Sequence, residues 1–519
     1  MSVVWSRRVV IGLAAVWVAA LVIVCAWRIG FPLELEWMEG GSLHQALRLQ
    51  QGLAIYPEPS AEFVPFLYTP FYSAVLAGLG MVLPLGYSLG RVVSVVAAVM
   101  IGAGLWRLVG REGKPRAHQA AAVGMWCAGY VFTFRWYDVA RADSLFLALL
   151  LWGLVLLRDA RGDRRRAMVA GVLVALAFWT KQTAAVFILA SGLVGLWVAP
   201  REVLWYAGVI AAIDGGGMLL GQRWSGGTLW TYLFELHQTH AFNLERFRSK
   251  TWGMFLHAAP FLVVLAAWVS GWAVRKDRRD KSVGVVYWGA LAIAGLVVSA
   301  LGYSTQWAEP NAFMPGVCFA AAALAVALPV GRGEAVGLGL VAAQMVFALV
   351  LEPRYQPIQD RGPAGFKDSY AWQDPWRTVP TREAWAQARA QREALEAMRP
   401  GPVLALQRPW WSVIAGGAGH VGSMGINDVP KEQAREIQRS VAQAVATGSY
   451  AAVMLDGEPP PWLRTALQRG YRVQERRTGA SRVLPLTGYM SAAGMVKPWL
   501  GPQIVYVRRE APGTGGDGG

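Results

Sequence analysis

Long apolar runs separated by short polar segments fill the first two thirds of the chain. The first run, from Val9 to Trp27, follows the basic pair Arg7-Arg8. A helix of this length crosses a hydrocarbon core of about 30 Å at about 1.5 Å per residue. Ten further runs lie at 88–106, 117–134, 144–157, 167–180, 182–199, 203–221, 253–274, 283–301, 313–330 and 335–351. The pattern predicts a mainly α, polytopic helical membrane protein with about eleven spans.

A cleaved signal peptide is the alternative reading of the first run. That reading requires a small-x-small cleavage site, and no such site follows the apolar stretch. We therefore expect the first run to be retained as a membrane span.

The positions of the basic residues predict the orientation of the chain in the membrane. They cluster in three loops, which carry Arg107, Arg111, Lys114 and Arg116, then Arg158, Arg161, Arg164, Arg165 and Arg166, then Arg275, Lys276, Arg278, Arg279 and Lys281. All three loops are cytoplasmic if the N-terminus is cytoplasmic and the short segment Pro70–Leu85 does not cross. We expect that segment, bounded by prolines, to be a juxtamembrane or re-entrant helix. An odd number of spans then places the C-terminal part outside the cytoplasm.

Four regions follow from this pattern: a transmembrane domain at 1–352, a proline-containing linker at 353–380, an extracytoplasmic domain at 381–510 and a disordered tail at 511–519. Within the third region, helices are expected at 381–398, 430–446 and 462–469. Strands are expected in VLALQ, YAAVML, YRVQERR and QIVYVRR. The alternation predicts a small α/β layer.

Composition supports a membrane protein, with 55% hydrophobic and 16% charged residues. The net charge of +16 arises from Lys and Arg in short loops, so nucleic acid is not an expected partner. Cys25, Cys127 and Cys318 lie in separate apolar runs without metal-ligand spacing, and we expect neither disulfide nor zinc.

The polar segments of the outer face hold the candidate chemistry. Glu39 precedes a short amphipathic helix that opens at Gly40 and ends near Gly52, with Glu34 and Glu36 nearby. A carboxylate here is either a solvated residue favoured by the helix dipole or a general base whose proton affinity is raised by partial desolvation.

The segment FRWYDVARADSL places Arg135, Asp138, Arg141 and Asp143 within nine residues at the outer end of a span. Charged residues beside the apolar slab are costly and tend to be paired or functional. These four are either interfacial anchors paired with one another, beside the aromatic Trp136, or part of a site.

Lys181 interrupts the apolar stretch from Val169 to Val198, where it either binds an anionic phosphate or snorkels to the surface. The loop 222–251 adds His237, His240 and Arg248 as candidates for phosphate or acceptor contacts. The two histidines share a helix face but lack the further ligands of a metal site.

The glycine-rich stretch AGGAGHVGSMG lacks a phosphate-binding pattern. His420, Asn427 and Asp428 either touch an acceptor or belong to a plain loop.

Five short motifs in order, WMEGG, FVPFLYTPFY, GRVVS, ARADSLF and TKQTA, resemble the bacterial GT-C superfamily of polytopic glycosyltransferases. The resemblance is to the family 39 and Rgt-type branch, relatives of protein O-mannosyltransferases and the lipid A aminoarabinose transferase. It covers roughly residues 1 to 350. It implies an enzyme that transfers a sugar from a polyprenyl phosphate or diphosphate to an acceptor on the outer face of the membrane.

The resemblance also implies roles for individual residues. The acidic residue of the first outer loop maps to Glu39, with Glu36 as the alternative, because the family's usual Asp-Glu pair is missing. The second acidic position matches Asp143, and the lysine after the fifth span matches Lys181. Donor-phosphate contacts are expected from Lys181, Arg141, Arg135 and Arg248, and sugar or acceptor contacts from Tyr68, Trp136, His237, His240 and Asn311.

We therefore expect an inverting hexosyl- or pentosyltransferase of the bacterial inner membrane, acting on an envelope lipid, glycan or protein. A divalent cation is a possible cofactor, and the metal site is unknown. The alternatives are a transporter or lipid flippase, which requires charges at span midpoints or broken helices in paired repeats, and a non-catalytic binder of lipid-linked glycans.

Overall fold

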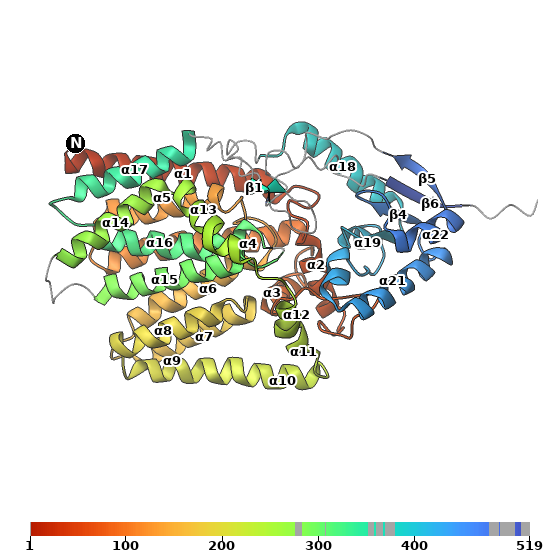
Figure 1. Ribbon diagram of the computed structural model, residues 1–519, viewed down its shortest axis with the longest axis horizontal. Coiled ribbons are helices and arrows are strands. Elements are labelled where there is room, and N and C mark those ends of the chain that lie inside the picture. Colours follow the sequence, from red (N-terminus) through yellow and green to blue (C-terminus); the bar gives the residue numbers. More distant parts are fainter. Residues whose placement is uncertain are drawn as a thin grey trace, which may run out of the picture.

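The computed structural model is elongated, with a bundle of long helices at one end and a small α/β layer at the other (Figure 1). It describes residues 2–275, 283–306, 308–350, 358–359, 367–368, 379–476, 487 and 504–509. The N-terminus lies at the end of the bundle away from the α/β layer (Figure 1).

Five helical segments in the described part of the chain are long and apolar enough to cross a membrane. They are α1 (Val3–Ile29), α4 (Tyr87–Arg111), Glu202–Trp224, α15 (Val283–Tyr303) and Pro310–Ala327. The third combines α9 (Glu202–Ile210), η1 (Ala211–Gly215) and α10 (Gly216–Trp224), and the fifth combines η4 (Pro310–Phe313) and α16 (Met314–Ala327).

Five shorter helices fall on other predicted runs. They are α5 (Arg116–Phe132), α6 (Ala142–Arg158), α7 (Arg164–Thr180), α8 (Ala184–Val198) and α17 (Glu334–Val350). Each has 15 to 17 residues. At 1.5 Å per residue they are about 23–26 Å long, slightly less than the hydrocarbon core. The helices are therefore where the pattern predicts them, and the total of eleven spans stays a prediction.

The run 253–274 departs from its expected single span. It forms α13 (Thr251–Ala258) and α14 (Pro260–Arg275), and the segments Arg246–Leu256 and Pro260–Gly271 are bent by 95°. Pro260 has no N–H to continue the helix, and its ring clashes with the preceding turn.

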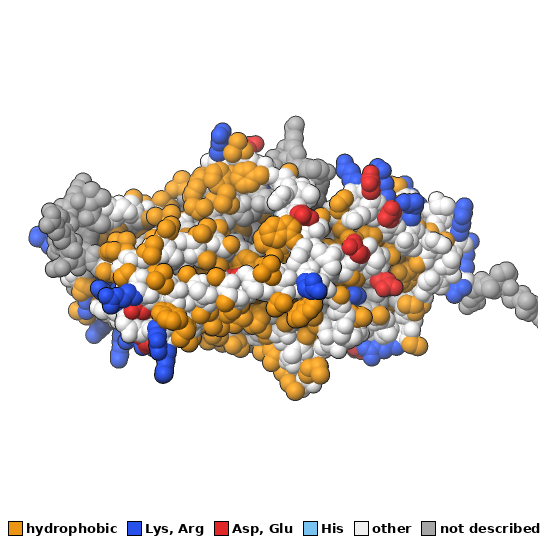
Figure 2. All heavy atoms as spheres, turned by 90° about the horizontal axis from the view of Figure 1, so that it is seen from below, with side chains coloured by type: hydrophobic (Ala, Val, Ile, Leu, Met, Phe, Trp, Pro, Cys, Tyr) orange, Lys and Arg blue, Asp and Glu red, His pale blue; other side chains and the backbone are white. Residues whose placement is uncertain are grey.

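The outside of the bundle is apolar. Leu189, Leu204 and Ile293 are 72%, 68% and 65% exposed. Figure 2 shows hydrophobic side chains spread along the bundle, whereas Lys and Arg gather at its far end and over the α/β layer. Large exposed apolar surfaces of this kind face lipid. The chain is an integral membrane protein.

Two short helices follow α1. α2 (Glu39–Gln50) ends just before Gly52, which has the positive φ of 70° that favours glycine. α3 (Phe71–Leu79) has nine residues and is about 13 Å long, too short to cross a bilayer. Both helices lie where the sequence of this segment predicts them.

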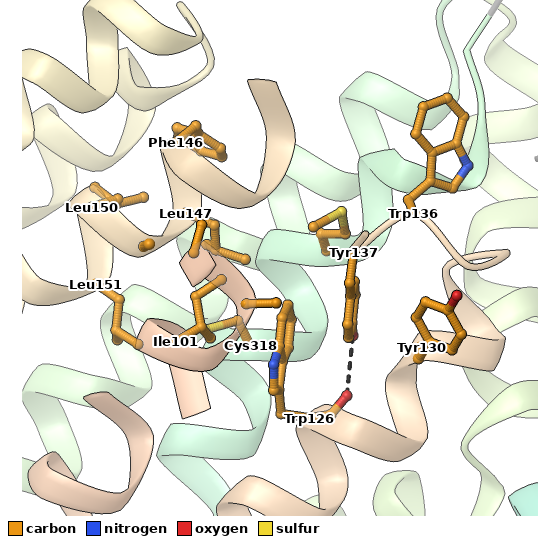
Figure 3. Packing of buried hydrophobic residues seen from close by; sticks show 14 of the residues in the cluster. Ile101, Trp126, Tyr130, Trp136, Tyr137, Phe146, Leu147, Leu150, Leu151 and Cys318 are labelled. Carbon is orange, nitrogen blue, oxygen red and sulfur yellow. Dashed lines mark hydrogen bonds between the residues drawn. The ribbon is translucent and has the colours of Figure 1, made fainter. Parts of the chain in front are cut away.

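The connection between α5 and α6 packs into the bundle core. Trp126 and Tyr137 stack with ring centroids 3.9 Å apart, and the Tyr137 hydroxyl donates to the Trp126 carbonyl at 3.1 Å (Figure 3). Gly129 leaves room for this arrangement, since a Cβ there would lie 2.9 Å from the Tyr137 hydroxyl oxygen. This packing fixes the backbone that leads to the site.

Short elements connect α10 to α13: α11 (Thr228–Trp230), η2 (Thr231–Glu235), α12 (Leu236–Gln238) and η3 (Arg246–Lys250). The expected linker lies mostly outside the described residues. Its described part is the antiparallel pair β1 (Ile358–Gln359) and β2 (Lys367–Asp368). The expected tail, 511–519, also lies outside them.

The C-terminal layer is a four-stranded sheet of order β3-β4-β6-β5. β3 (Val403–Ala405) is parallel to β4 (Ala452–Leu455), and β6 (Ile504–Arg508) is antiparallel to β4 and to β5 (Tyr471–Arg476). The helices are α18 (Arg382–Ala397), α19 (Trp410–Ile414), α20 (Ser423–Asp428), α21 (Lys431–Ala446) and α22 (Pro461–Gly470). The expected small α/β layer is confirmed.

Candidate functional site

A cavity of about 490 Å³ lies where the first outer loop, the start of α6, the α7–α8 turn and α12 meet. Its volume is within the range of small-molecule sites. Eight of the residues singled out from sequence line it: Tyr68, Trp136, Arg141, Asp143, Lys181, His237, His240 and Asn311. Glu36, Glu39, Arg135 and Arg248 do not line it.

Asp143 and Lys181 form the charged centre of the cavity. Asp143 lies in the first turn of α6, and Lys181 is the residue at which α7 ends. The Lys181 Nζ donates to Asp143 Oδ1 at 2.5 Å, and the Asn311 Nδ2 donates to the same oxygen at 2.9 Å. The lysine is the more exposed partner, with 17% of its side chain accessible against 5% for the aspartate. A cation is thus presented to the cavity with a carboxylate behind it.

Arg141 lies beside this pair, between two aromatic rings. Its guanidinium carbon is 5.3 Å from the centroid of the Tyr68 ring and 5.1 Å from that of Trp136, within cation–π range. One nitrogen donates to the Tyr68 hydroxyl oxygen at 2.8 Å and another to Glu36 Oε2 at 2.9 Å. Lys181 also lies 5.9 Å from the Tyr68 ring, so this tyrosine contacts both cations.

Glu36 lies behind Arg141. Its Oε2 also accepts from the Met38 backbone N–H at 3.1 Å, while Oε1 is buried without a hydrogen-bond partner among the described residues. Burial raises the pKa of this carboxyl to about 7, and Arg141 opposes the rise. Its charge therefore depends on how closely Arg141 remains paired.

Glu39 is enclosed in the protein. It forms a two-pronged ion pair with Arg91 of α4, at 2.7 and 2.9 Å, and accepts backbone N–H bonds from Leu35 and Ala140, both at 2.7 Å. Neither charged side chain is exposed. The expectation of a solvated or only partly desolvated carboxylate is wrong, because the first loop folds back against α4 and encloses this side chain.

Arg91 also holds the first loop through backbone carbonyls. It donates to Phe31 at 2.6 Å and to Leu33 at 2.5 Å. Three of the motifs, WMEGG, GRVVS and ARADSLF, therefore meet at the Glu39–Arg91 pair. Sequence reasoning gave Arg91 no role, although an arginine near the start of an apolar run is a signal of a buried partner.

Asp138 has a distant partner too. Arg28, at the end of α1, donates to its two oxygens at 2.6 and 3.3 Å, and Tyr130 donates to it at 3.0 Å. Asp138, Arg141 and Asp143 of FRWYDVARADSL therefore form ion pairs across the fold, with Arg28, Glu36 and Lys181 respectively, instead of pairing with one another.

The two remaining arginines of the expected phosphate site lie apart from the cavity. Arg135 is buried in the α5–α6 connection with a φ of 68°. Arg248 is exposed in η3.

His237 ties α12 to the first loop and the α7–α8 turn. Its Nε2 is 2.7 Å from the Leu67 carbonyl and 2.8 Å from Nε2 of Gln182, which itself donates to the same carbonyl at 2.7 Å. Burial lowers the pKa of this histidine. Gln182 is a cavity residue that sequence reasoning passed over, although it follows Lys181 directly.

The C-terminal layer reaches the cavity and the first loop. Met424 of α20 lines the cavity, and Trp411 of α19 donates to Glu34 Oε2 at 2.9 Å. His420 is buried, accepting from the Ala405 N–H at 2.8 Å. Among the described residues, no three His, Cys, Asp or Glu side chains are grouped so as to hold a metal ion.

Known proteins resemble the chain in sequence and in fold. The model of glycosyltransferase family 87 matches residues 66–299, a range that includes Arg91, Asp143 and Lys181 but not Glu39. No curated protein matches the chain in sequence. The family match confirms the membrane glycosyltransferase expected from the motifs, but the matching family is 87, whereas the motifs resemble the family 39 and Rgt-type branch.

Two solved structures are similar to the chain. One is the crystal structure of ArnT from Cupriavidus metallidurans in the apo state, with a TM-score of 0.48, 16% identity, and coverage of 88% of this chain and 84% of that chain. The other is ArnT from the same organism bound to undecaprenyl phosphate, with a TM-score of 0.47, 14% identity, and coverage of 88% and 85%.

Proposed function

We propose that this membrane glycosyltransferase moves a sugar from a polyprenyl phosphate or diphosphate to an envelope lipid, glycan or protein. The observation that carries the proposal is the placement of Lys181 and Arg141 on one cavity wall, each backed by a carboxylate. Such a pair of cations suits a phosphate-linked donor, because charge-assisted bonds to phosphate are the strong ones.

The donor phosphate binds to Lys181 and Arg141 in this proposal. Lys181 turns from Asp143 towards the phosphate, and Arg141 stays fixed by Glu36 and Tyr68. When the bond between the anomeric carbon and the phosphate oxygen breaks, the phosphate leaves with the electron pair. Cations aimed at that developing charge commonly supply the largest catalytic effect. A single displacement inverts the anomeric configuration.

The three carboxylates have different tasks. Asp143 sets the position of Lys181 and, with Asn311, faces the sugar end of the cavity. Glu36 and Glu39 act as positioning residues, since Glu36 anchors Arg141 and Glu39 anchors the first loop on Arg91. A role for Glu39 as base would require the ion pair with Arg91 to open.

The membrane orientation rests on charge. Lys and Arg side chains gather at the end of the bundle away from the C-terminal layer (Figure 2). The cavity is lined in part by Met424 of that layer. The positive-inside rule then assigns the cavity to the outer face of the bacterial inner membrane. We propose a catalytic domain at 1–352, joined by residues 353–380 to an extracytoplasmic domain at 381–510.

A flippase is the second candidate. Asp214 supports it, because this acid lies in η1, at the middle of the span Glu202–Trp224. Acids inside the membrane commonly mark transport pathways. However, Asp214 does not line the cavity, which contains the cations that suit a phosphate.

Proteoliposomes separate the two functions. Purified protein would be given polyprenyl phosphates and diphosphates carrying radiolabelled hexoses or pentoses, with bacterial envelope lipid and glycan fractions as acceptors. The proposal predicts labelled acceptor and released polyprenyl phosphate. Labelled donor that crosses the bilayer without transfer would instead support the flippase.

A further inference from the structure

A histidine and an aspartate from distant parts of the chain meet at the cavity. His240 follows α12, and Asp428 is the last residue of α20 in the C-terminal layer. Their Nε2 and Oδ1 atoms are 3.3 Å apart. The His240 side chain is 12% exposed and lines the cavity, whereas Asp428 is 2% exposed and lies behind it.

This arrangement defines the chemical state of the histidine. The Asp428 carboxylate accepts a hydrogen bond from Nε2–H, so the neutral imidazole keeps its proton on Nε2 and its free electron pair on Nδ1. The same division of roles operates in hydrolase triads, in which a buried aspartate fixes the tautomer of the catalytic histidine.

We propose that His240, oriented by Asp428, accepts the proton of the acceptor hydroxyl during sugar transfer. The inference rests on the proposed function and identifies the base of that reaction. The acceptor oxygen forms its bond to the anomeric carbon while the bond to the phosphate oxygen breaks. The electron pair leaves with the phosphate, and the hydroxyl proton passes to His240 Nδ1.

The carboxylates near the cavity are less suited to this step. Asp143 is held by Lys181 and Asn311, and Lys181 stabilises the charged form of this carboxylate and weakens it as a base. Glu36 lies behind Arg141 and does not line the cavity. His237 is held by the Leu67 carbonyl. His240 instead has a carboxylate beside it, which stabilises the imidazolium that forms when the proton is accepted.

Several charged groups surround His240. The His237 ring lies edge-on with its centroid 5.8 Å away, and Asp428 faces it from α20. Arg141, Asp143, Lys181 and Glu309 line the same cavity. The negative Asp428 favours the imidazolium that forms during transfer, while the cations are positioned for the phosphate.

The C-terminal layer thereby contributes directly to the site. Asp428 supplies the orienting carboxylate, and its Oδ2 is buried with no hydrogen-bond partner in the part of the chain that the structure describes. Met424 of the same helix forms part of the cavity wall. The active site is therefore complete only with the C-terminal layer docked.

The test is a pH–rate profile of the full-length protein in proteoliposomes, with a transferable donor at saturation and varied acceptor. The wild-type rate is expected to rise with pH as the base loses its proton through one ionisation. His240→Gln should lose about 10²- to 10⁴-fold in rate together with this ionisation, the range typical of general-base catalysis. Asp428→Asn should lower the rate at least 10-fold and shift the ionisation, with the donor KM unchanged.

A second variant separates the loss of the base from a loss of folding. Imidazole added to His240→Ala should restore part of the rate, which a purely structural role would not permit. A normal pH profile in His240→Gln, or no rescue in a folded His240→Ala, would overturn the inference and leave the proposed function intact. No transfer by the wild type from any donor would overturn the proposed function and this inference with it.

Discussion

Lys181 and Asp143, 38 positions apart in the chain, form an ion pair of 2.5 Å at the centre of the cavity. The pair joins the end of α7 to the first turn of α6, so two helices of the bundle present one cation to the cavity. Asn311, from the connection between α15 and α16, bonds the same carboxylate oxygen. The lysine is thereby held at the cavity wall, where it can turn towards an anion.

Replacing Lys181 by methionine should raise the KM for the lipid donor at least 10-fold and lower kcat at least 100-fold. The substitution removes the cation that binds the donor phosphate. The same cation stabilises the negative charge that develops on the phosphate as it leaves. Initial rates over a range of donor concentrations measure both constants.

Arg201→Met is the matched control, since Arg201 is an exposed cation at the start of α9, away from the cavity. It should keep wild-type rates. Equal effects of the two substitutions would show that Lys181 contributes only general surface charge.

Glu39→Gln should destabilise the protein, because it leaves the buried Arg91 without its counter-charge. Breaking a buried ion pair costs about 3–5 kcal/mol, and the apparent melting temperature should fall by several degrees. The double variant Glu39→Gln/Arg91→Met should recover part of the loss. Fluorescence-monitored unfolding in detergent provides the measurement.

The same Glu39 variant separates two roles. If Glu39 only positions the first loop, the fraction of Glu39→Gln protein that remains folded should keep measurable sugar transfer. An unchanged melting temperature with transfer abolished would identify Glu39 as the base instead.

Acid should loosen the contact between the first loop and the C-terminal layer. Burial lowers the pKa of His44 to about 3 and that of His420 to about 4, below the ordinary 6.5. Between about pH 6.5 and pH 4 the unfolded chain binds protons that the folded protein excludes, so stability is present above pH 6.5 and is lost as the pH falls.

Melting temperatures at pH 7.5 and pH 5.0 test whether the stability of the folded protein falls with the pH. The wild type should lose more stability over the interval than the double variant His44→Gln/His420→Gln. An equal loss in both proteins would mean that other groups determine the acid response.

Much of the fold follows from local sequence. Apolar runs place α4 to α8, α15 and α17 within a few residues, because each helix must cover its backbone in lipid. The turn at Lys181 is also predictable, as a single cation within a long apolar stretch. The 95° bend before Pro260 has a local signal too, a proline inside an apolar run.

The partners of the charged residues do not follow from local sequence. Glu39 pairs with Arg91 because α2 packs on α4, and Asp138 pairs with Arg28 because the α5–α6 connection returns to the end of α1. Such contacts join segments 52 and 110 positions apart. The periodicity of a single helix carries no information about which other helix it will meet, so only the tertiary structure reveals that Glu39 is enclosed.

The central claim is that the Asp143–Lys181 cavity transfers a sugar from a lipid phosphate. The most direct measurement is the single-turnover rate from a polyprenyl-phosphate-linked sugar in proteoliposomes, for wild type, Asp143→Asn and the control Arg201→Met. We predict a loss of at least 100-fold in Asp143→Asn, with the protein still folded, and no loss in the control. Wild-type transfer by a folded Asp143→Asn protein would contradict the account.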